Sequence, residues 1–155
     1  MNVGIVVYSK GGNTLSVAQK LQDKFTESGF SVGWFPLKVV NSAKSGGEAS
    51  FENIPDLSGF DALVFASWVE AFSLCTDMRS FLRQIPNLGK KKVALFVTQH
   101  FPFAWMGGNH AIRQMKAQCE KKGAIVVEAG VVNWSSSRRE GMIFSLVERL
   151  AKSFR

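Results

Sequence analysis

Five short apolar runs divide the chain, and four of them lead into segments whose apolar residues recur at helical spacing. Runs rich in Val, Ile, Leu, Phe and Ala are typical of strands buried on both faces of a parallel sheet. Alternating strands and helices favour a doubly wound architecture, and 155 residues suffice for one domain. We therefore expect a single α/β domain over residues 1–155, with a five-stranded parallel sheet as the middle of three layers. The expected strands are 3–8, 31–40, 61–67, 92–98 and 124–132.

Helical spacing follows the first, third, fourth and fifth runs. The polar segment 41–60, rich in Ser and Gly, follows the second run instead. A parallel crossover needs a dozen or more residues, so this segment can make the connection with at most a short helix, and we expect it to be mobile. The four helical stripes are Leu15, Ala18, Leu21 and Phe25; Met78, Phe81, Leu82, Ile85 and Leu88; Ile112, Met115 and Cys119; and Ile143, Leu146, Val147, Leu150 and Phe154.

A polar loop with two glycines joins the first strand to the first helix. Glycines let backbone N–H groups approach an anion closely, and a helix N-terminus offers unpaired N–H donors and a positive dipole end. The spacing is neither a P-loop nor the three-glycine dinucleotide fingerprint. We predict a phosphate site for something other than a nucleoside triphosphate; the alternative is a turn that binds nothing. The loop residues are Ser9, Lys10, Gly11, Gly12, Asn13 and Thr14.

The run YSKGGNTLSVA resembles the phosphate loop of the flavodoxin-like family, which opens the first helix and holds the phosphate of FMN. Ser9, Gly12, Asn13 and Thr14 match the family pattern, while Gly11 stands where the family usually has a threonine. The resemblance implies FMN as the cofactor and the strand order 2-1-3-4-5. The uninterrupted fifth strand resembles the short-chain type. Pro36 agrees, because the second strand is at an edge in this order.

Large aromatic residues gather in the two loops that follow the third and fourth strands. In a doubly wound sheet, ligands bind beyond the carboxyl ends of the strands where the strand order reverses. By resemblance these are the isoalloxazine loops, with Trp68 as the stacking residue and Phe101 or Trp105 on the other face. The alternative is an ordinary core or a protein interface. The predicted cofactor-binding residues are Ser9, Lys10, Gly11, Gly12, Asn13, Thr14, Ser67, Trp68, Val69, Glu70, Phe72, Thr98, Gln99, His100, Phe101 and Trp105.

Two titratable residues in these loops have open roles. Many flavodoxins place a glycine in the loop after the third strand, whose peptide contacts the half-reduced flavin, but 68–72 has none. Glu70 lies near that contact, where it would disfavour an anionic reduced flavin or point to solvent. His100 would assist proton transfer to a flavin or a quinone-like substrate, or be a surface residue.

The formal net charge of +7 bears on partners. Lysine and arginine cluster at 90–92, 121–122 and 138–139 without interleaved aromatics, which argues against nucleic acid. Flavodoxins are as a family acidic, so a basic member needs other partners, such as an acidic redox protein or the phosphates of a nicotinamide cofactor. No apolar run is long enough to cross a membrane and no signal peptide is recognised, so we expect a cytoplasmic protein without membrane insertion.

Metal chemistry is not expected. Cys75 and Cys119 lie in segments expected to be helical, without CxxC spacing, and His100 and His110 have no clustered partners. A signalling receiver on the same fold needs carboxylates at the strand ends, where this chain has Ser9, Ser67 and Thr98.

The sequence thus favours an FMN-binding flavodoxin-like protein that acts in electron transfer. Whether it is a carrier or an enzyme stays open, because a small FMN-dependent NAD(P)H:quinone-type oxidoreductase fits the same residues. A less favoured alternative is a basic binding module without cofactor, for which strong salt dependence would be the signature. The oligomeric state also stays open.

Overall fold

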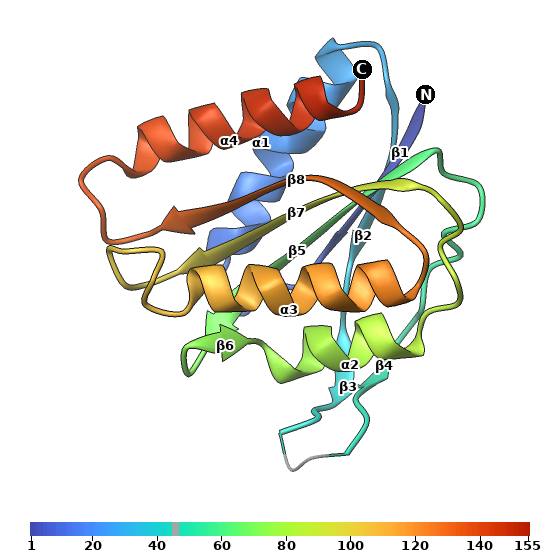
Figure 1. The fold of residues 1–155 in the computed structure, drawn as a ribbon, viewed down its shortest axis with the longest axis horizontal. Coiled ribbons are helices and arrows are strands. Elements are labelled where there is room, and N and C mark those ends of the chain that lie inside the picture. Colours follow the sequence, from blue (N-terminus) through green and yellow to red (C-terminus); the bar gives the residue numbers. More distant parts are fainter. Residues whose placement is uncertain (45–46) are drawn as a thin grey trace.

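The computed structural model describes residues 1–44 and 47–155. Five parallel strands form its centre in the order β2-β1-β5-β7-β8, which is the predicted order 2-1-3-4-5 (Figure 1). A sixth strand, β6, pairs antiparallel with the end of β5. The strands of this sheet are β1 (Asn2–Val7), β2 (Ser31–Pro36), β5 (Ala62–Glu70), β6 (Ser73–Leu74), β7 (Lys92–Gln99) and β8 (Ile125–Asn133).

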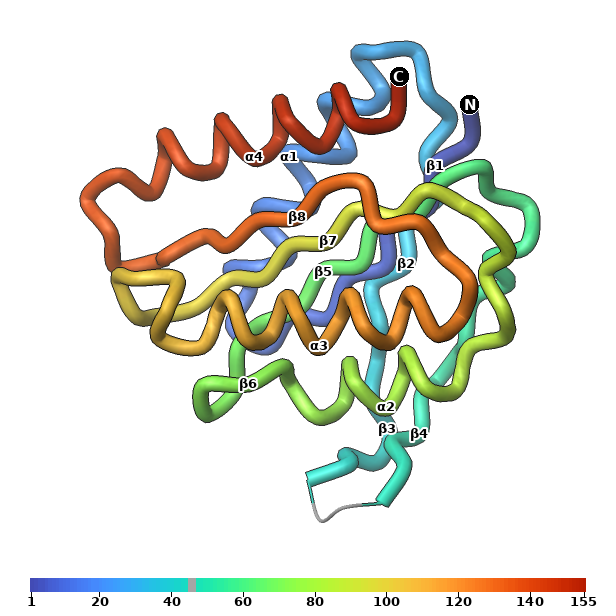
Figure 2. Tube along the Cα trace, viewed as in Figure 1, coloured from blue at the N-terminus to red at the C-terminus, as the bar shows by residue number. Residues whose placement is uncertain are grey.

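Two helices cover each face of the sheet, so the predicted three layers are confirmed (Figures 1 and 2). The helices α1 (Asn13–Glu27) and α4 (Arg139–Ser153) pack on one face, and α2 (Thr76–Gln84) and α3 (Gly108–Lys121) pack on the other. The predicted stripes lie on the buried sides of the helices, because burying apolar area against the sheet is what stabilises an amphipathic helix; Ile85 and Leu88 are also buried but lie beyond the end of α2. None of the described helices is both long and apolar enough to cross a lipid bilayer.

The second strand is shorter than predicted, since β2 ends at Pro36 rather than at residue 40. Ser31 N donates to Met1 O (3.0 Å) and Leu37 N donates to Val7 O (2.8 Å) on the β1 side. Because successive N–H groups of a strand alternate in direction, Pro36 lacks its N–H on the open edge of the sheet, where the loss costs little.

The connection between β2 and β5 contains a small antiparallel hairpin of β3 (Val39–Asn41) and β4 (Ser50–Phe51). None of its described residues is helical, as the polar composition predicts. Ser45 and Gly46, which fall in the segment expected to be mobile, lie outside the described residues.

The third parallel strand is longer than predicted. The segment 68–72, expected to be a loop, continues β5 to Glu70 and then turns into β6 through Ala71 (φ 48°) and Phe72 (φ 64°). The prediction that Cys75 lies in a helix is therefore wrong. It is the N-cap residue, just before the first turn of α2. That helix ends at Gln84 rather than near Leu88, because Pro86 holds Ile85 in an extended conformation (ψ 151°).

Candidate functional site

The carboxyl ends of β1, β5 and β7 meet at one edge of the sheet, where their loops enclose a cavity of about 300 Å³, here called the loop cavity. Three segments far apart in the sequence contribute to it. All of the lining residues belong to the set predicted from the sequence. They are Ser9, Lys10, Gly11, Asn13, Thr14, Trp68, Val69, Thr98, Gln99 and His100.

The loop after β1 presents an open N-terminus of α1 to this cavity. Gly12 is the N-cap residue, with φ 93°, and no side chain caps the helix. The Ser9 hydroxyl accepts a hydrogen bond from Gly12 N (3.1 Å), which holds the turn closed. The first turn of α1 has no acidic residue, and a Cβ atom added at Gly11 or Gly12 would meet nothing within 4 Å. Free N–H donors, the helix dipole and Lys10 together make this end of the cavity suited to an anion.

Thr14 connects the loop to the neighbouring strand end. Its hydroxyl lies 2.8 Å from the hydroxyl of Thr98 at the end of β7, and Thr14 is only 1% exposed. One hydroxyl donates to the other, so the donor still has a lone-pair acceptor site and the acceptor still has a proton to give. This pair fixes the start of α1 against the sheet.

Trp68 supplies the aromatic surface of the loop cavity. It is half-buried near the end of β5, its ring centroid lies 6.4 Å from that of Tyr8, and Lys10 Nζ lies 5.5 Å from its centroid. A cation at this distance is attracted by the indole face. Trp68 and Lys10 also line a second cavity of about 290 Å³, on the side of Tyr8 and Asp77.

A hydrogen-bond network around the Asp77 carboxylate lies beside Trp68, and the sequence did not predict it. Tyr8 OH donates to Asp77 Oδ2 (3.1 Å), while Ser42 Oγ and Ala43 N donate to Asp77 Oδ1 (3.0 and 2.7 Å). Burial, and then the charge of Asp77, raise the pKa of Tyr8 well above its ordinary value. No local spacing signals this network, because Tyr8 and Asp77 are 69 residues apart.

The β5–β6 hairpin is held from three sides. Glu70 Oε1 accepts hydrogen bonds from Thr76 N (3.2 Å) and Thr76 Oγ1 (3.1 Å), so its carboxylate covers the N-terminus of α2 instead of pointing to solvent. Leu74 N donates to Gln114 Oε1 of α3 (2.8 Å). A Cβ atom at Gly107 would lie 2.6 Å from Phe72 Cα, so only glycine lets the two backbones approach this closely.

The aromatic residues of the later loop take part in two stacked pairs, one of which includes Phe72 of the β5–β6 turn. Phe72 and Phe101 face each other with centroids 5.1 Å apart and planes 11° from parallel. Phe103 and Trp105 stack at 6.1 Å and 6°. Trp105 is 74% exposed and lines a separate cavity outside the loop cavity.

Gln99 anchors this loop from the end of β7. Its Nε2 donates to Phe103 O and to Asn133 Oδ1, both at 2.6 Å. Its Oε1 is buried without a partner, as are Ser67 Oγ and Trp68 Nε1. Three of the five such atoms found among the described residues thus lie at the ends of β5 and β7. Unpartnered buried polar atoms cost about 1–3 kcal/mol each, so their concentration here marks a site built for something besides stability.

Six residues of the predicted set do not line the loop cavity. Ser67 is buried in β5, Glu70 binds Thr76, and Gly12 forms the turn behind the lining residues. The other three are the aromatics of the stacked pairs, Phe72, Phe101 and Trp105.

The cysteines and histidines form no separate centre. Burial raises the pKa of the Cys75 thiol to about 11 and that of Cys119 to about 12, so both are poor nucleophiles near neutral pH. In the described part of the chain, no three His, Cys, Asp or Glu side chains gather as metal ligands would.

Comparison with known proteins finds matches for the structure but not for the sequence. No protein-family model matches the sequence, and no curated protein matches it significantly. Solved structures match closely. A flavodoxin from Streptococcus pneumoniae TIGR4 superposes with a TM-score of 0.71 over 99% of this chain and 97% of its own, at 18% identity. The chain has the flavodoxin-like fold.

Two further flavodoxin-like structures cover nearly the whole of this chain. A short-chain flavodoxin associated with a bacterial microcompartment has a TM-score of 0.71 and 14% identity, over 99% of this chain and 95% of its own. A flavoprotein from Lactobacillus acidophilus, solved in complex with FMN, has a TM-score of 0.66 and 17% identity, over 94% of this chain and 97% of its own. At these low sequence identities, the similarity to flavodoxins establishes the fold alone.

Proposed function

We propose that this chain binds FMN in the loop cavity and acts in electron transfer. The observation that carries the proposal is the loop cavity itself, which joins an open, positively polarised helix N-terminus to an indole face at the point where strand order reverses. FMN has the matching chemistry, with a phosphate at one end and a flat aromatic ring at the other. The FMN complex of the Lactobacillus acidophilus flavoprotein supports the same choice.

The loop after β1 would hold the phosphate. Backbone N–H groups at the start of α1 point toward the loop, Lys10 supplies a positive charge, and Asn13 is exposed. The Ser9 hydroxyl is engaged by Gly12 N, so its own proton is available to a phosphate oxygen. Hydrogen bonds to a charged phosphate are stronger than those between neutral groups. These contacts would compensate for the hydroxyl missing at Gly11.

The ring would be held mainly by Trp68. Phe72 and Phe101 stack on each other, so in this arrangement they do not both offer a face to a ligand, whereas the Trp68 side chain lines the cavity. Stacking on an indole buries aromatic area and excludes water from the ring. When bound, FMN accepts and donates electrons, and the surrounding protein sets how readily it does so.

Two classes of redox partner fit this chain, an acidic protein and a small-molecule cosubstrate. A net charge of +7 favours an acidic redox protein as the electron donor or acceptor. A small oxidoreductase that uses a nicotinamide cofactor and a quinone-like acceptor is the second candidate, and the exposed His100 at the cavity wall would then exchange protons with solvent.

The test is a fluorescence titration with FMN and with riboflavin, which lacks the phosphate. We expect FMN to bind and riboflavin to bind at least about tenfold more weakly, because the phosphate contacts are lost. Asn13→Ala together with Thr14→Ala should abolish the preference for FMN. Thr26→Ala, at the exposed far end of the same helix, is the matched control and should change nothing. An unchanged FMN affinity in the folded double variant would mean that the phosphate binds elsewhere.

A further inference from the structure

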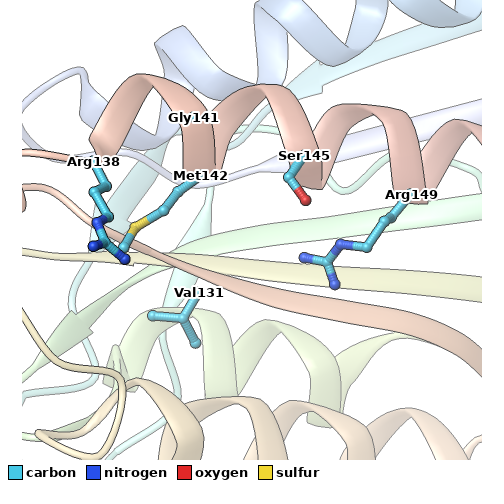
Figure 3. A pocket seen from close by; sticks show the side chains of 6 residues that line it. All are labelled: Val131, Arg138, Gly141, Met142, Ser145 and Arg149. Atoms are coloured by element: carbon cyan, nitrogen blue, oxygen red, sulfur yellow. The ribbon is translucent and has the colours of Figure 1, made fainter.

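A larger cavity lies away from the loop cavity, between α4 and the edge strand β8. It measures about 580 Å³, and a neighbouring cavity of about 450 Å³ shares Arg138 and Met142 with it. We call the two together the basic groove. The first cavity is lined by Val131, Arg138, Gly141, Met142, Ser145 and Arg149, as Figure 3 shows. The second is lined by Pro102, Phe103, Ala104, Trp105, Asn109, Asn133, Ser136, Ser137, Arg138 and Met142.

The charged groups of the basic groove are all positive. Arg138 and Arg149 extend from α4 toward β8 (Figure 3), and no acidic side chain lines either cavity. Arg149 Nη1 forms an ion pair with Glu128 Oε1 (3.4 Å), while its Nη2 has no hydrogen-bond partner among the described residues. The Arg138 side chain makes no ion pair or hydrogen bond with any described residue. A guanidinium left free beside a concave surface is suited to a phosphate or carboxylate oxygen.

One end of the groove carries an aromatic platform. Phe103 and Trp105 are parallel to within 6°, and they are 55% and 74% exposed. Exposed aromatic faces stack well on the flat face of a nucleotide base.

The two arginines are far apart along the groove. Arg138 is the N-cap residue of α4 and Arg149 is eleven positions further on, which at the usual helical rise places their Cα atoms roughly 16 Å from each other. Arg138 lines both cavities of the groove, whereas Arg149 lines only the larger one. The combination of a base platform, a nearby arginine and a distant arginine fits an extended nucleotide whose phosphate groups lie at two separated places.

We propose that the basic groove binds an extended nucleotide with separated phosphates, such as a phosphorylated dinucleotide. Its base stacks on Trp105, Arg138 holds the nearer phosphates and Arg149 holds the further one. Ser137 and Ser145, whose hydroxyls have no partner among the described residues, add hydrogen-bond donors along the wall.

The groove is next to the loop cavity. Gln99 lines the loop cavity and donates to Asn133, and Asn133 donates through Nδ2 to Met142 Sδ (3.7 Å) on the groove wall. A nucleotide in the groove would therefore lie beside the proposed flavin, which is where a cosubstrate of the second candidate function would be needed. The binding itself requires no flavin.

Calorimetric titration of flavin-free protein with NADP⁺ tests the proposal. The oxidised form has no hydride to give, so the measurement reports binding alone. We expect NADP⁺ to bind more tightly than NAD⁺, because NAD⁺ has the pyrophosphate but lacks the separate 2′-phosphate on the ribose. Arg138→Ala together with Arg149→Ala should weaken NADP⁺ binding by about tenfold or more. Lys152→Ala removes an exposed cation of the same helix outside the groove and should have less than about a twofold effect.

The aromatic platform has its own readout. Trp105→Ala should weaken NADP⁺ binding to the flavin-free protein, because the base loses its stacking surface. Absence of NADP⁺ binding, or an equal loss in Lys152→Ala, would overturn the proposal. Binding of a short single-stranded oligonucleotide without binding of NADP⁺ would overturn it in favour of a nucleic-acid surface. None of these outcomes depends on whether FMN binds.

Discussion

The two ends of the loop cavity are built in opposite ways. The loop 9–14 is open, because Cβ atoms at Gly11 and Gly12 would meet nothing within 4 Å and no side chain caps α1. The β5–β6 hairpin is closely packed, because Gly107 lies against the Phe72 backbone, Thr76 binds Glu70 and Gln114 binds Leu74.

This difference separates recognition of an anion from placement of a ring. Backbone N–H groups bind a phosphate with little rearrangement, so the loop needs space more than packing. A stacking residue works only if its position is fixed, and the hairpin fixes Trp68 through neighbours that never touch the ligand. Substitutions at the two ends should therefore affect different quantities, stability at the hairpin and affinity at the loop.

The largest effect is expected at Gly107. Gly107→Ala places a Cβ 2.6 Å from Phe72 Cα at a residue with φ 115°, which should lower the free energy of unfolding by about 3 kcal/mol. Gly11→Ala is the matched control in open space and should change it by less than about 0.5 kcal/mol. Denaturant unfolding of both variants measures this; equal losses would remove the contrast between the two ends.

Trp68→Ala should act on the ligand. Loss of the indole face should weaken FMN binding by about tenfold or more and make the bound flavin more fluorescent, because stacked aromatics quench it. Trp68→Phe keeps a ring and should retain most of the affinity. If fluorescence and affinity both stay as in the parent protein, the stacking role belongs to another residue.

Glu70→Ala should cost stability without costing affinity. It removes the acceptor for Thr76 N and Thr76 Oγ1 at the start of α2, which is worth about 1 kcal/mol. FMN affinity should change by less than about twofold. A large change in affinity, measured by the same titration, would place Glu70 at the flavin instead.

The smallest effect concerns Cys75, at the end of the hairpin. Its pKa is raised by burial to about 11 in the folded protein, so the folded state keeps the proton longer than the unfolded state. Its contribution is complete well below the ordinary thiol pKa and is lost as pH rises toward 11; the loss at pH 9.5 is about 0.8 kcal/mol. Unfolding at pH 7.5 and 9.5 should show a smaller alkaline loss in Cys75→Ala than in the parent; identical losses would contradict this.

Much of the fold was predictable because it depends on local periodicity. The apolar runs and helical stripes identify the parallel strands and the four helices, and Pro36 indicates the edge strand. All residues that line the loop cavity were also predicted, because the ends of parallel strands meet at the switch point.

The rest depends on contacts between distant residues. The turn at Ala71 and Phe72 contains no glycine, so nothing in the sequence marks the hairpin that extends β5. The Tyr8–Asp77 hydrogen bond and the basic groove arise from residues that only the folded chain brings together. The Tyr8–Asp77 pair has no repeating spacing, and although Arg138, Met142, Ser145 and Arg149 recur at helical spacing, only the fold places them against Val131 and the aromatic loop.

The central claim is that the loop cavity holds FMN, and the visible absorption spectrum of the purified protein tests it most directly. The spectrum is recorded before and after adding FMN and removing the excess. The account predicts flavin bands that stay with the protein after the excess is removed. A protein that stays colourless and leaves the fluorescence of added FMN unchanged would contradict it, and the binding module without cofactor would then be the better reading of this fold.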